Sequence, residues 1–258
     1  MLRFRSLGSG SSGNATVVEA TSGSTRLRLL VDCGFNLKQL DLRLARAGLS
    51  ADGLDAIFVT HEHADHIGSA LALSLRQRIP VWMSEGTHVA SGSADFDGRL
   101  HIAADGSPVE LGCLRLDPFT VPHDAREPLQ LRCTDGNRSL AILTDLGHIS
   151  THVLHHLAGC DALLLECNHD VDLLATSSYH PALKRRVGGQ YGHLSNDAAA
   201  ALLQAINHAK LGTLVAAHLS AQNNRPALAR TALAFASGRL AADVGVANQS
   251  HGTDWLTV

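Results

Sequence analysis

Three histidines and an aspartate fall within six positions of the segment FVTHEHADHIGS, residues 58–69. Alternate side chains of an extended segment share one side, so His61 and His63 can converge on one ion. Asp65 and His66 fall at the turn into a predicted helix, where they can face a second ion. Imidazole and carboxylate together favour borderline divalent metals. We therefore expect two divalent metal ions here, zinc or manganese.

A histidine-rich surface loop is the alternative interpretation, because the chain contains 16 histidines. A turn after a buried strand usually draws Gly, Asn, Asp or Ser for backbone reasons. Four potential ligands in six positions are not that composition, so the pattern favours a metal site. The HExxH motif of zinc proteases is excluded, because its second histidine would stand at position 65, which is Asp65.

Strands and helices must position these residues. Apolar patterning predicts a strand at 26–32, a helix that starts at Asn36 and stops at Gly48, and a strand at 56–60. Further strands are predicted at 81–84, 114–121, 129–134, 139–144, 161–167, 213–218, 244–247 and 255–258. Further helices are predicted at about 65–77, 151–158, 181–187, 196–209 and 226–236. Clustered strands with helices around them favour an α/β arrangement, sheets packed together with helices outside.

The bulk composition is that of a globular chain. Its 258 residues are 45% apolar and 17% charged, and the absence of a convincing linker or short repeat favours one domain. The net charge of −3 means that any nucleic-acid contact must use a local basic patch. No secretory signal and no window of roughly 18 to 20 apolar residues is found. We expect a cytoplasmic protein without membrane contact, and we infer no protein partner.

The segment THEHADH at 60–66 resembles the HxHxDH signature of the metallo-β-lactamase fold, a four-layer αββα sandwich. Other residues match the family's order. Asp32 closes LLVD as an acid that orients the histidines from behind. His123 in TVPHDAREP, Asp145 in AILTDLG and His218 in LVAAHLS each stand just past an apolar strand. That shared position would bring their loops to one edge of the sheets.

The resemblance implies an allocation of metal ligands. One ion would be held by His61, His63 and His123, and the other by Asp65, His66 and His218. Asp145 would bridge them. Two ions roughly 3.5 to 4 Å apart can lower the pKa of a shared water and stabilise developing charge. Hydrolysis is the implied reaction.

The second half of the chain narrows the kind of hydrolase. DALLLECNHD at 161–170 followed by YGHLSNDAAAALL at 191–203 resembles the acid-then-histidine pair of the phosphodiesterase branch. Glu166 and His193 are the matching residues, and with Asp65 they are the expected catalytic residues. A glutamate raises a histidine's preference for a proton, which suits protonation of a leaving alkoxide. The alternative for His193 is a position beside a helix cap formed by Ser195.

Two segments are candidates for substrate contact. The loop from Gly8 to Asn14 has small residues that would let backbone amides approach a phosphate, with Ser9, Ser11, Ser12 and Asn14 as its polar members. In HPALKRR, the cations Lys184, Arg185 and Arg186 could neutralise backbone phosphates. A plain connector and a solvated helix face are the respective alternatives. Asn168 and His169 follow Glu166 and could line the pocket.

The blocks SLGSGSSGNA, VTHEHADH, TDLG, LLECNHD, GHLSNDAA and AHLSAQNN are similar to the YycJ/WalJ type of small metallo-β-lactamase protein. This resemblance implies a nuclease, a 5′ to 3′ exonuclease acting on DNA rather than RNA. The 73 positions from Asp145 to His218 (218 − 145) leave no room for an inserted β-CASP domain. The Gly/Pro-rich arm of tRNA 3′-processing enzymes is also missing.

Two other functions stay open. One is hydrolysis of a small molecule, namely a cyclic phosphodiester, a thioester or a lactam, although the missing signal peptide weakens the lactam. The other is a metal-binding regulator with little turnover. A binding module would need neither the bridging Asp145 nor the pair formed by Glu166 and His193, so hydrolysis of nucleic-acid phosphodiesters is the preferred interpretation.

Overall fold

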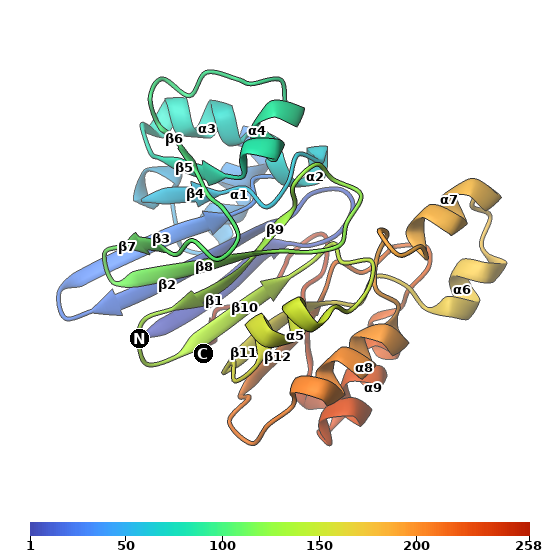
Figure 1. Ribbon diagram of the computed structural model, residues 1–258. Coiled ribbons are helices and arrows are strands. Elements are labelled where there is room, and N and C mark those ends of the chain that lie inside the picture. The colour runs from blue at the N-terminus through green and yellow to red at the C-terminus, as the bar shows by residue number, and fades with distance from the viewer.

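Two facing β-sheets form the middle of the molecule, and helices lie on their outer sides (Figure 1). The structure is a computed structural model that describes residues 1–258. The arrangement is the predicted αββα sandwich. No helix has both the length and the apolar character needed to cross a bilayer.

The first sheet combines the N-terminal half of the chain with its last strand, in the order β14-β1-β2-β3-β4-β5-β6. Pairing is antiparallel from β14 to β3 and parallel from β3 to β6. Its strands are β1 (Leu2–Gly8), β2 (Ala15–Ser22), β3 (Thr25–Val31), β4 (Ala56–Phe58), β5 (Val81–Met83), β6 (Leu100–Ile102) and β14 (Leu256–Thr257).

The second sheet repeats this plan in the order β7-β8-β9-β10-β11-β12-β13. Pairing is antiparallel from β7 to β10 and parallel from β10 to β13. Each of the two sheets therefore has antiparallel strands on one side and parallel strands on the other. Its strands are β7 (Val109–Leu111), β8 (Leu114–Thr120), β9 (Leu129–Thr134), β10 (Ser139–Leu143), β11 (Ala162–Glu166), β12 (Thr213–Ala217) and β13 (Gly245–Val246).

Three apolar clusters fill the layers. On β3, Leu29 and Val31 point into the cluster between the sheets, while Leu30 points to the helices outside. This alternation follows the two-residue period of a strand buried on both faces. Outer helices α1 (Leu37–Arg46) and α3 (Ala70–Gln77) cover the first sheet. The second sheet is covered by α5 (Thr151–Leu157), α8 (Asn196–Ile206) and α9 (Pro226–Ser237).

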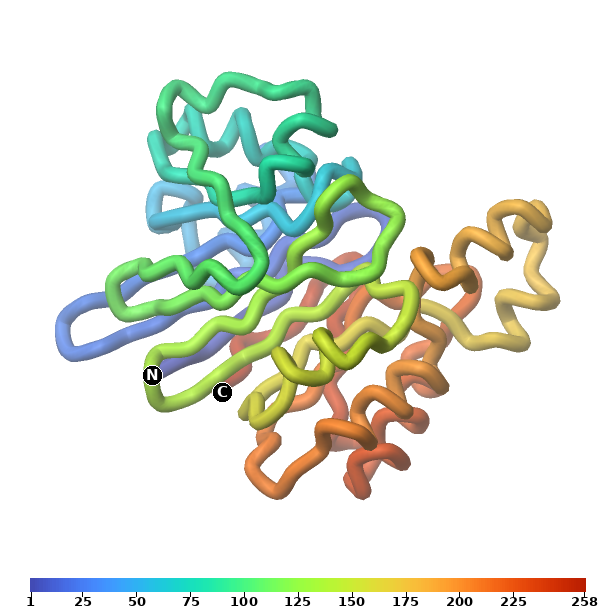
Figure 2. The backbone as a smooth tube through the Cα atoms, in the orientation of Figure 1, coloured from blue at the N-terminus to red at the C-terminus, as the bar shows by residue number.

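The shorter helices lie mainly in connections. They are α2 (Ala64–Ile67), α4 (Glu85–Ala90), α6 (Val171–Thr176), α7 (Pro181–Val187) and the 3₁₀ helices η1 (Ala51–Gly53) and η2 (Ala241–Asp243). Between β11 and α8, the segment with α6 and α7 stands out from the sandwich (Figure 2). No residue of α7 is buried. We call residues 171–187 the arm.

The prediction of one helix over 65–77 was wrong. The structure has α2 and α3, separated at Gly68, whose φ is 31°. A Cβ at Gly68 would lie 2.4 Å from the carbonyl oxygen of Cys33, so only glycine allows this close approach. The hairpin of β1 and β2, joined by the Gly/Ser loop, was not predicted.

Candidate metal centre

The candidate residues gather where the parallel strands of both sheets end. Asp32 follows β3, the 60–66 segment follows β4, Asp145 follows β10, Glu166 ends β11 and His218 follows β12. Because parallel neighbours end at one edge of a sheet, residues far apart in sequence meet there. The structure brings together all seven expected metal ligands.

Three of these residues have a left-handed backbone. The φ angles are 63° at Asp32, 55° at Asp145 and 53° at His218. Outside glycine this conformation costs about 1 to 2 kcal/mol per residue. Each residue stands within two positions of the end of its strand, so the left-handed turn redirects a side chain towards the centre. Strain of this kind concentrates at functional sites.

The first group of ligand atoms consists of three imidazole nitrogens. His63 Nδ1 lies 3.0 Å from His61 Nε2 and 3.3 Å from His123 Nε2. The opposite nitrogen of His123 donates to the carbonyl of Gly192 at 3.1 Å, which leaves Nε2 free to act as an acceptor or ligand. Three nitrogens that face one another so closely fit a shared divalent cation.

The second group consists of Asp65, His66 and His218. Asp65 Oδ2 lies 3.6 Å from His66 Nε2 and 3.7 Å from His218 Nε2. Asp145 stands between the groups, with Oδ2 at 2.9 Å from His66 Nε2 and Oδ1 at 3.8 Å from His123 Nε2. Asp145 Oδ2 and His218 Nε2 are buried and make no well-formed hydrogen bond; their nearest polar neighbours are other ligand atoms of the cluster, His66 Nε2 and Asp65 Oδ2. Nitrogen and oxygen ligand atoms thus face one another in a buried space, so the donor set fits metal binding.

Asp32 lies behind this centre rather than in it. One of its oxygens is 2.7 Å from His66 Nδ1, and the other accepts from the Thr60 backbone N–H at 2.8 Å. The Thr60 hydroxyl also donates to Asp32. A carboxylate on Nδ1 leaves Nε2 of His66 as the ligand atom. These contacts place Asp32 behind His66, where it could have the orienting role that the resemblance implies.

Glu166 connects the predicted acid–histidine pair to the metal centre. Its Oε1 accepts from Nδ1 of His193 at 2.8 Å and lies 3.0 Å from Nδ1 of His218. Its Oε2 accepts from the backbone N–H groups of Leu146 at 2.8 Å and Leu194 at 3.1 Å. Ser195 does cap α8, but it does so through its own side chain. The helix cap therefore does not account for the contact between His193 and Glu166.

Burial lowers the pKa of His61 and His123, whereas charge pairing outweighs burial around Asp145 and Glu166. Burial opposes the ionised carboxyl of Glu166, yet His193 and His218 lower its pKa to about 2. Burial likewise opposes a charged His218, yet Asp145, Asp65 and Glu166 raise its pKa to about 10. The pKa of His66 is raised well above its usual range by Asp145 and Asp32 despite burial. Without a cation, protons on these histidines balance the buried carboxylates.

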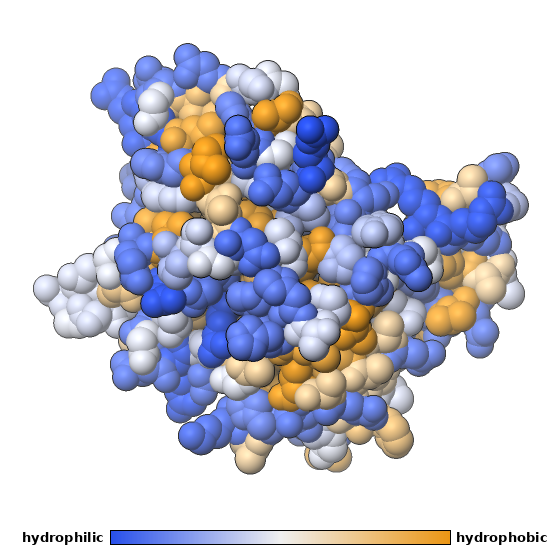
Figure 3. Space-filling model, viewed as in Figure 1, coloured by the Kyte–Doolittle hydropathy of each residue, from blue (hydrophilic) through white to orange (hydrophobic).

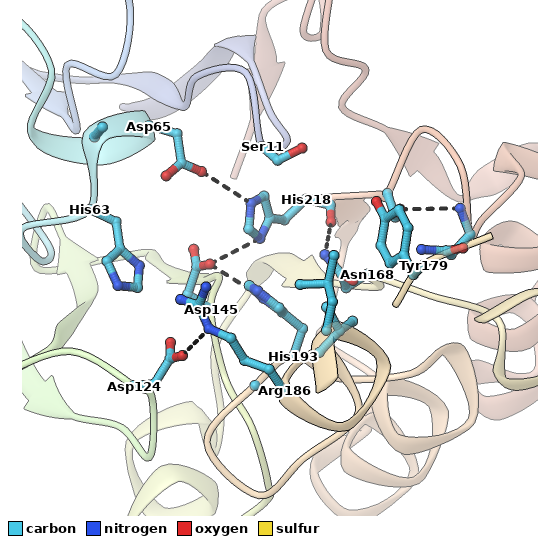
Figure 4. Close-up of a pocket in the computed structure, with 16 residues that line it drawn as sticks. Ser11, His63, Asp65, Asp124, Asp145, Asn168, Tyr179, Arg186, His193 and His218 are labelled. Atoms are coloured by element: carbon cyan, nitrogen blue, oxygen red, sulfur yellow. Dashed lines mark hydrogen bonds and ion pairs between the residues drawn. The ribbon is translucent and has the colours of Figure 1, made fainter. Parts of the chain in front are cut away.

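A cavity of about 370 Å³ opens onto the centre. Figure 4 shows Asp65, Asp145 and His193 gathered around the ring of His218, with Asp124 and Arg186 at the rim. Arg186 Nε donates to Asp124 Oδ2 at 2.5 Å. Most of the lining residues are polar or charged, so the cavity suits a polar or charged ligand that reaches the metal-ligand atoms.

The Gly/Ser loop from Gly8 to Asn14 makes mostly internal contacts instead of the expected substrate contacts. Ser9 and Asn14 are buried: the Ser9 hydroxyl accepts from the His218 backbone N–H, and the Asn14 amide contacts Asp65 and His66. The backbone N–H of Ser12 donates to the side chain of Gln249. Of the four nominated residues, only Ser11 lines the cavity. The loop braces the metal ligands, because its polar groups already have internal partners.

The other nominated residues are divided between two cavities. Asn168 lines the cavity that opens onto the metal centre, where its amide donates to the His218 carbonyl at 3.0 Å. His169, Lys184 and Arg185 line a neighbouring cavity of about 430 Å³ that also reaches His193. The Lys184 ammonium already donates to the carbonyl of Ala175 at 2.7 Å.

The sequence analysis did not identify Tyr179 and Asn223, which also line the cavity that opens onto the metal centre. Asn223 is fully buried, and neither its amide nitrogen nor its amide oxygen has a hydrogen-bond partner. The only sequence feature that could have indicated Asn223 is its place in the segment AHLSAQNN, which resembles the YycJ/WalJ type. The spacing offered no way to tell it from Asn224, whose amide pairs with Asn196.

Comparison with known proteins agrees with this geometry. A family model described as a beta-lactamase superfamily domain matches residues 27–218. The chain is 33% identical over 257 residues to exodeoxyribonuclease YycJ of Bacillus anthracis, covering 98% of this chain and 96% of that protein. It is 33% identical over 250 residues to exodeoxyribonuclease WalJ of Streptococcus pneumoniae serotype 2, covering 95% and 90%.

Among solved structures, the metallo-beta-lactamase fold protein YhfI from Bacillus subtilis superposes with a TM-score of 0.75 at 18% identity. The superposition covers 99% of this chain and 98% of YhfI, which shows a common fold. The chain therefore belongs to the beta-lactamase superfamily domain family, as a metallo-β-lactamase-fold protein of the YycJ/WalJ type.

Proposed function

We propose that this chain, by its family a metal-dependent hydrolase of nucleic acid, is a DNA exonuclease with a dinuclear centre. His61, His63 and His123 would hold one zinc or manganese ion, and Asp65, His66 and His218 the other, with Asp145 between them. When bound, two divalent ions would lower the pKa of a water and stabilise negative charge on the attacked phosphate. The 5′ to 3′ direction follows the resemblance to YycJ and WalJ.

The observation that carries this proposal is the pair formed by Glu166 and His193 beside the ligand cluster. Burial opposes a charged His193, but Glu166 at 2.8 Å outweighs it and raises the pKa of the imidazole. This raised pKa favours the protonated form of His193 at the wall of the cavity. An alkoxide leaving a phosphodiester is a poor leaving group, and His193 donates that proton to it.

A thioester would need this acid less, because a thiolate departs more readily than an alkoxide. The nuclease assignment is also supported by the two relatives, both named exodeoxyribonucleases, at 33% identity. Hydrolysis of a small phosphodiester could use the same acid, and cleavage assays on a small diester distinguish it from DNA hydrolysis.

The arm is the proposed contact for the nucleic-acid backbone. Hydrophilic residues cover α7 on the face seen in Figure 3. Lys184 and Arg185 line the cavity that reaches His193, so phosphates next to the scissile bond would meet these cations. Elements α5 to β12 occupy the chain between Asp145 and His218, which supports a single domain without a β-CASP insertion.

The test is cleavage of end-labelled duplex DNA, single-stranded DNA and RNA in manganese, with bis(p-nitrophenyl) phosphate as a small diester. We expect metal-dependent shortening of DNA, and loss of cleavage in His66→Ala and Asp145→Ala. His251→Ala, at an exposed histidine away from the centre, is the matched control and should cut normally. Wild-type cleavage of the small diester alone would replace the nuclease proposal by the small-molecule alternative.

The His193 assignment needs its own variant. His193→Ala should keep its bound metals and lose at least about a hundredfold in kcat, the range of a missing general acid. Metal content by mass spectrometry separates this effect from loss of the centre. If the variant holds its metals and cuts DNA as fast as wild type, His193 is not the acid.

A further inference from the structure

A second group of metal-ligand side chains lies outside the candidate metal centre. It consists of Asp105, in the connection between β6 and β7, and of His152 and His156 on α5. One ligand atom from each residue lies within 4.8 Å of the other two. His152 Nε2 is 2.9 Å from Asp105 Oδ2.

The helix presents both histidines on one side. Residues four apart are neighbours on a helix surface, and the rings of His152 and His156 have centroids 4.6 Å apart. His155 is adjacent in sequence but is not part of the group. The spacing therefore directs two imidazoles, and not the third, towards Asp105.

Two of the three side chains are held in place by neighbours. Thr120 donates its hydroxyl at 2.6 Å and its backbone N–H at 3.3 Å to Asp105. The ring of His156 stacks on Phe119, with centroids 4.7 Å apart and planes 8° apart. Fixing ligands before binding reduces the ordering cost that an ion must offset.

The local charges also favour a cation. Burial and the neighbouring His152 lower the pKa of His156, so its imidazole is neutral and can act as a ligand near neutral pH. The hydrogen bonds from Thr120 lower the pKa of Asp105 despite partial burial, so its carboxyl is ionised. The guanidinium of Arg132 donates to the backbone carbonyls of His156 and Ala158.

We propose that Asp105, His152 and His156 bind a divalent transition-metal ion, foremost zinc, at a site separate from the candidate metal centre. Two imidazoles and one carboxylate form a donor set that zinc accepts, with the fourth position left to solvent. An ion here would join α5 to the β6–β7 connection, which the hydrogen bond from Thr120 to Asp105 ties to the end of β8. These elements flank the loops that carry Asp145 and His123, so the ion would brace the candidate centre from outside.

The experiment is equilibrium dialysis of the full chain against buffered zinc, followed by metal and protein analysis. The variants are His152→Ala, His156→Ala and Asp105→Asn, with His155→Ala as the matched control on the same helix. All variants keep every ligand of the candidate metal centre. We expect wild type and His155→Ala to bind one more zinc per chain than the other three variants, whose affinity at this site should fall at least about tenfold.

Equal zinc content in wild type and the three variants would overturn the proposal. An equal loss of bound zinc in His155→Ala would also overturn it, because it would indicate adventitious binding by surface histidines. His152→Ala changes an exposed side chain, so it tests the site even if loss of the Phe119 stacking unfolds His156→Ala. Circular dichroism identifies any unfolded variant. These outcomes do not depend on nuclease activity, so they stand or fall separately from the proposed function.

Discussion

Replacing Glu166 by glutamine is the sharpest test of how this centre is built. The side chain is fully buried, with two histidine nitrogens at Oε1 and two backbone N–H groups at Oε2. An amide keeps the size of the carboxylate but replaces one acceptor by a donor. If its NH₂ occupies the Oε2 position, the N–H groups of Leu146 and Leu194 both lose their acceptor.

In the other orientation the NH₂ faces Nδ1 of His193 and His218. Both rings must then move their proton to Nε2, and His218 can no longer offer that nitrogen to a metal. An uncompensated buried donor costs about 1 to 3 kcal/mol, so two of them remove about 2 kcal/mol or more from the free energy of unfolding. Without the carboxylate His193 also loses its preference for a proton, and we expect kcat to fall at least about a hundredfold.

The assays are urea unfolding of the metal-free chain, metal content, and DNA cleavage across pH. Glu127→Gln is the matched control, because Glu127 also accepts a backbone N–H, from Gly86 at 2.7 Å, but contacts no histidine. It should change stability by less than about 1 kcal/mol and leave cleavage intact. A Glu166→Gln protein with wild-type stability, metal content and kcat would refute this account of Glu166.

Three further predictions concern metal binding, substrate contact and packing. Metal binding at pH 7.5 should release about two protons, because the raised pKa values of His66 and His218 keep both charged without metal; calorimetry in buffers of different ionisation enthalpy measures this, and no buffer dependence would contradict it. The apparent metal affinity should therefore rise with pH. Asn223→Ala should raise KM for DNA about tenfold without lowering stability, since its buried amide has no internal partner; an unchanged KM would remove it from the substrate site. Gly34→Ala should lose about 1 to 3 kcal/mol of stability, because the added Cβ would lie 1.8 Å from the Asp65 carbonyl oxygen, whereas Gly212→Ala, with 3.6 Å to its nearest atom, should be tolerated; equal unfolding midpoints would show that the Gly34 contact relaxes freely.

The sequence alone determined the sheet-and-helix plan and the members of the candidate metal centre. Apolar strands carry their own period, and ligand-type residues directly after such strands are visible without coordinates, as with Asp145 and His218. These are local features, so a linear chain records them. The pair formed by Glu166 and His193 was expected only from the resemblance of their segments to the phosphodiesterase branch, because no local pattern relates two residues so far apart in sequence.

Only the tertiary structure decided which polar groups face the cavity and which support it. Ser9 and Asn14 belong to a polar loop by sequence, yet they are buried against the ligands, while Asn223 from the other half lines the cavity. The left-handed turns at Asp32, Asp145 and His218 are likewise invisible in the sequence, because none of these residues is glycine. The physical reason is that burial, hydrogen-bond partners and backbone strain depend on neighbours distant in sequence, which no local pattern encodes.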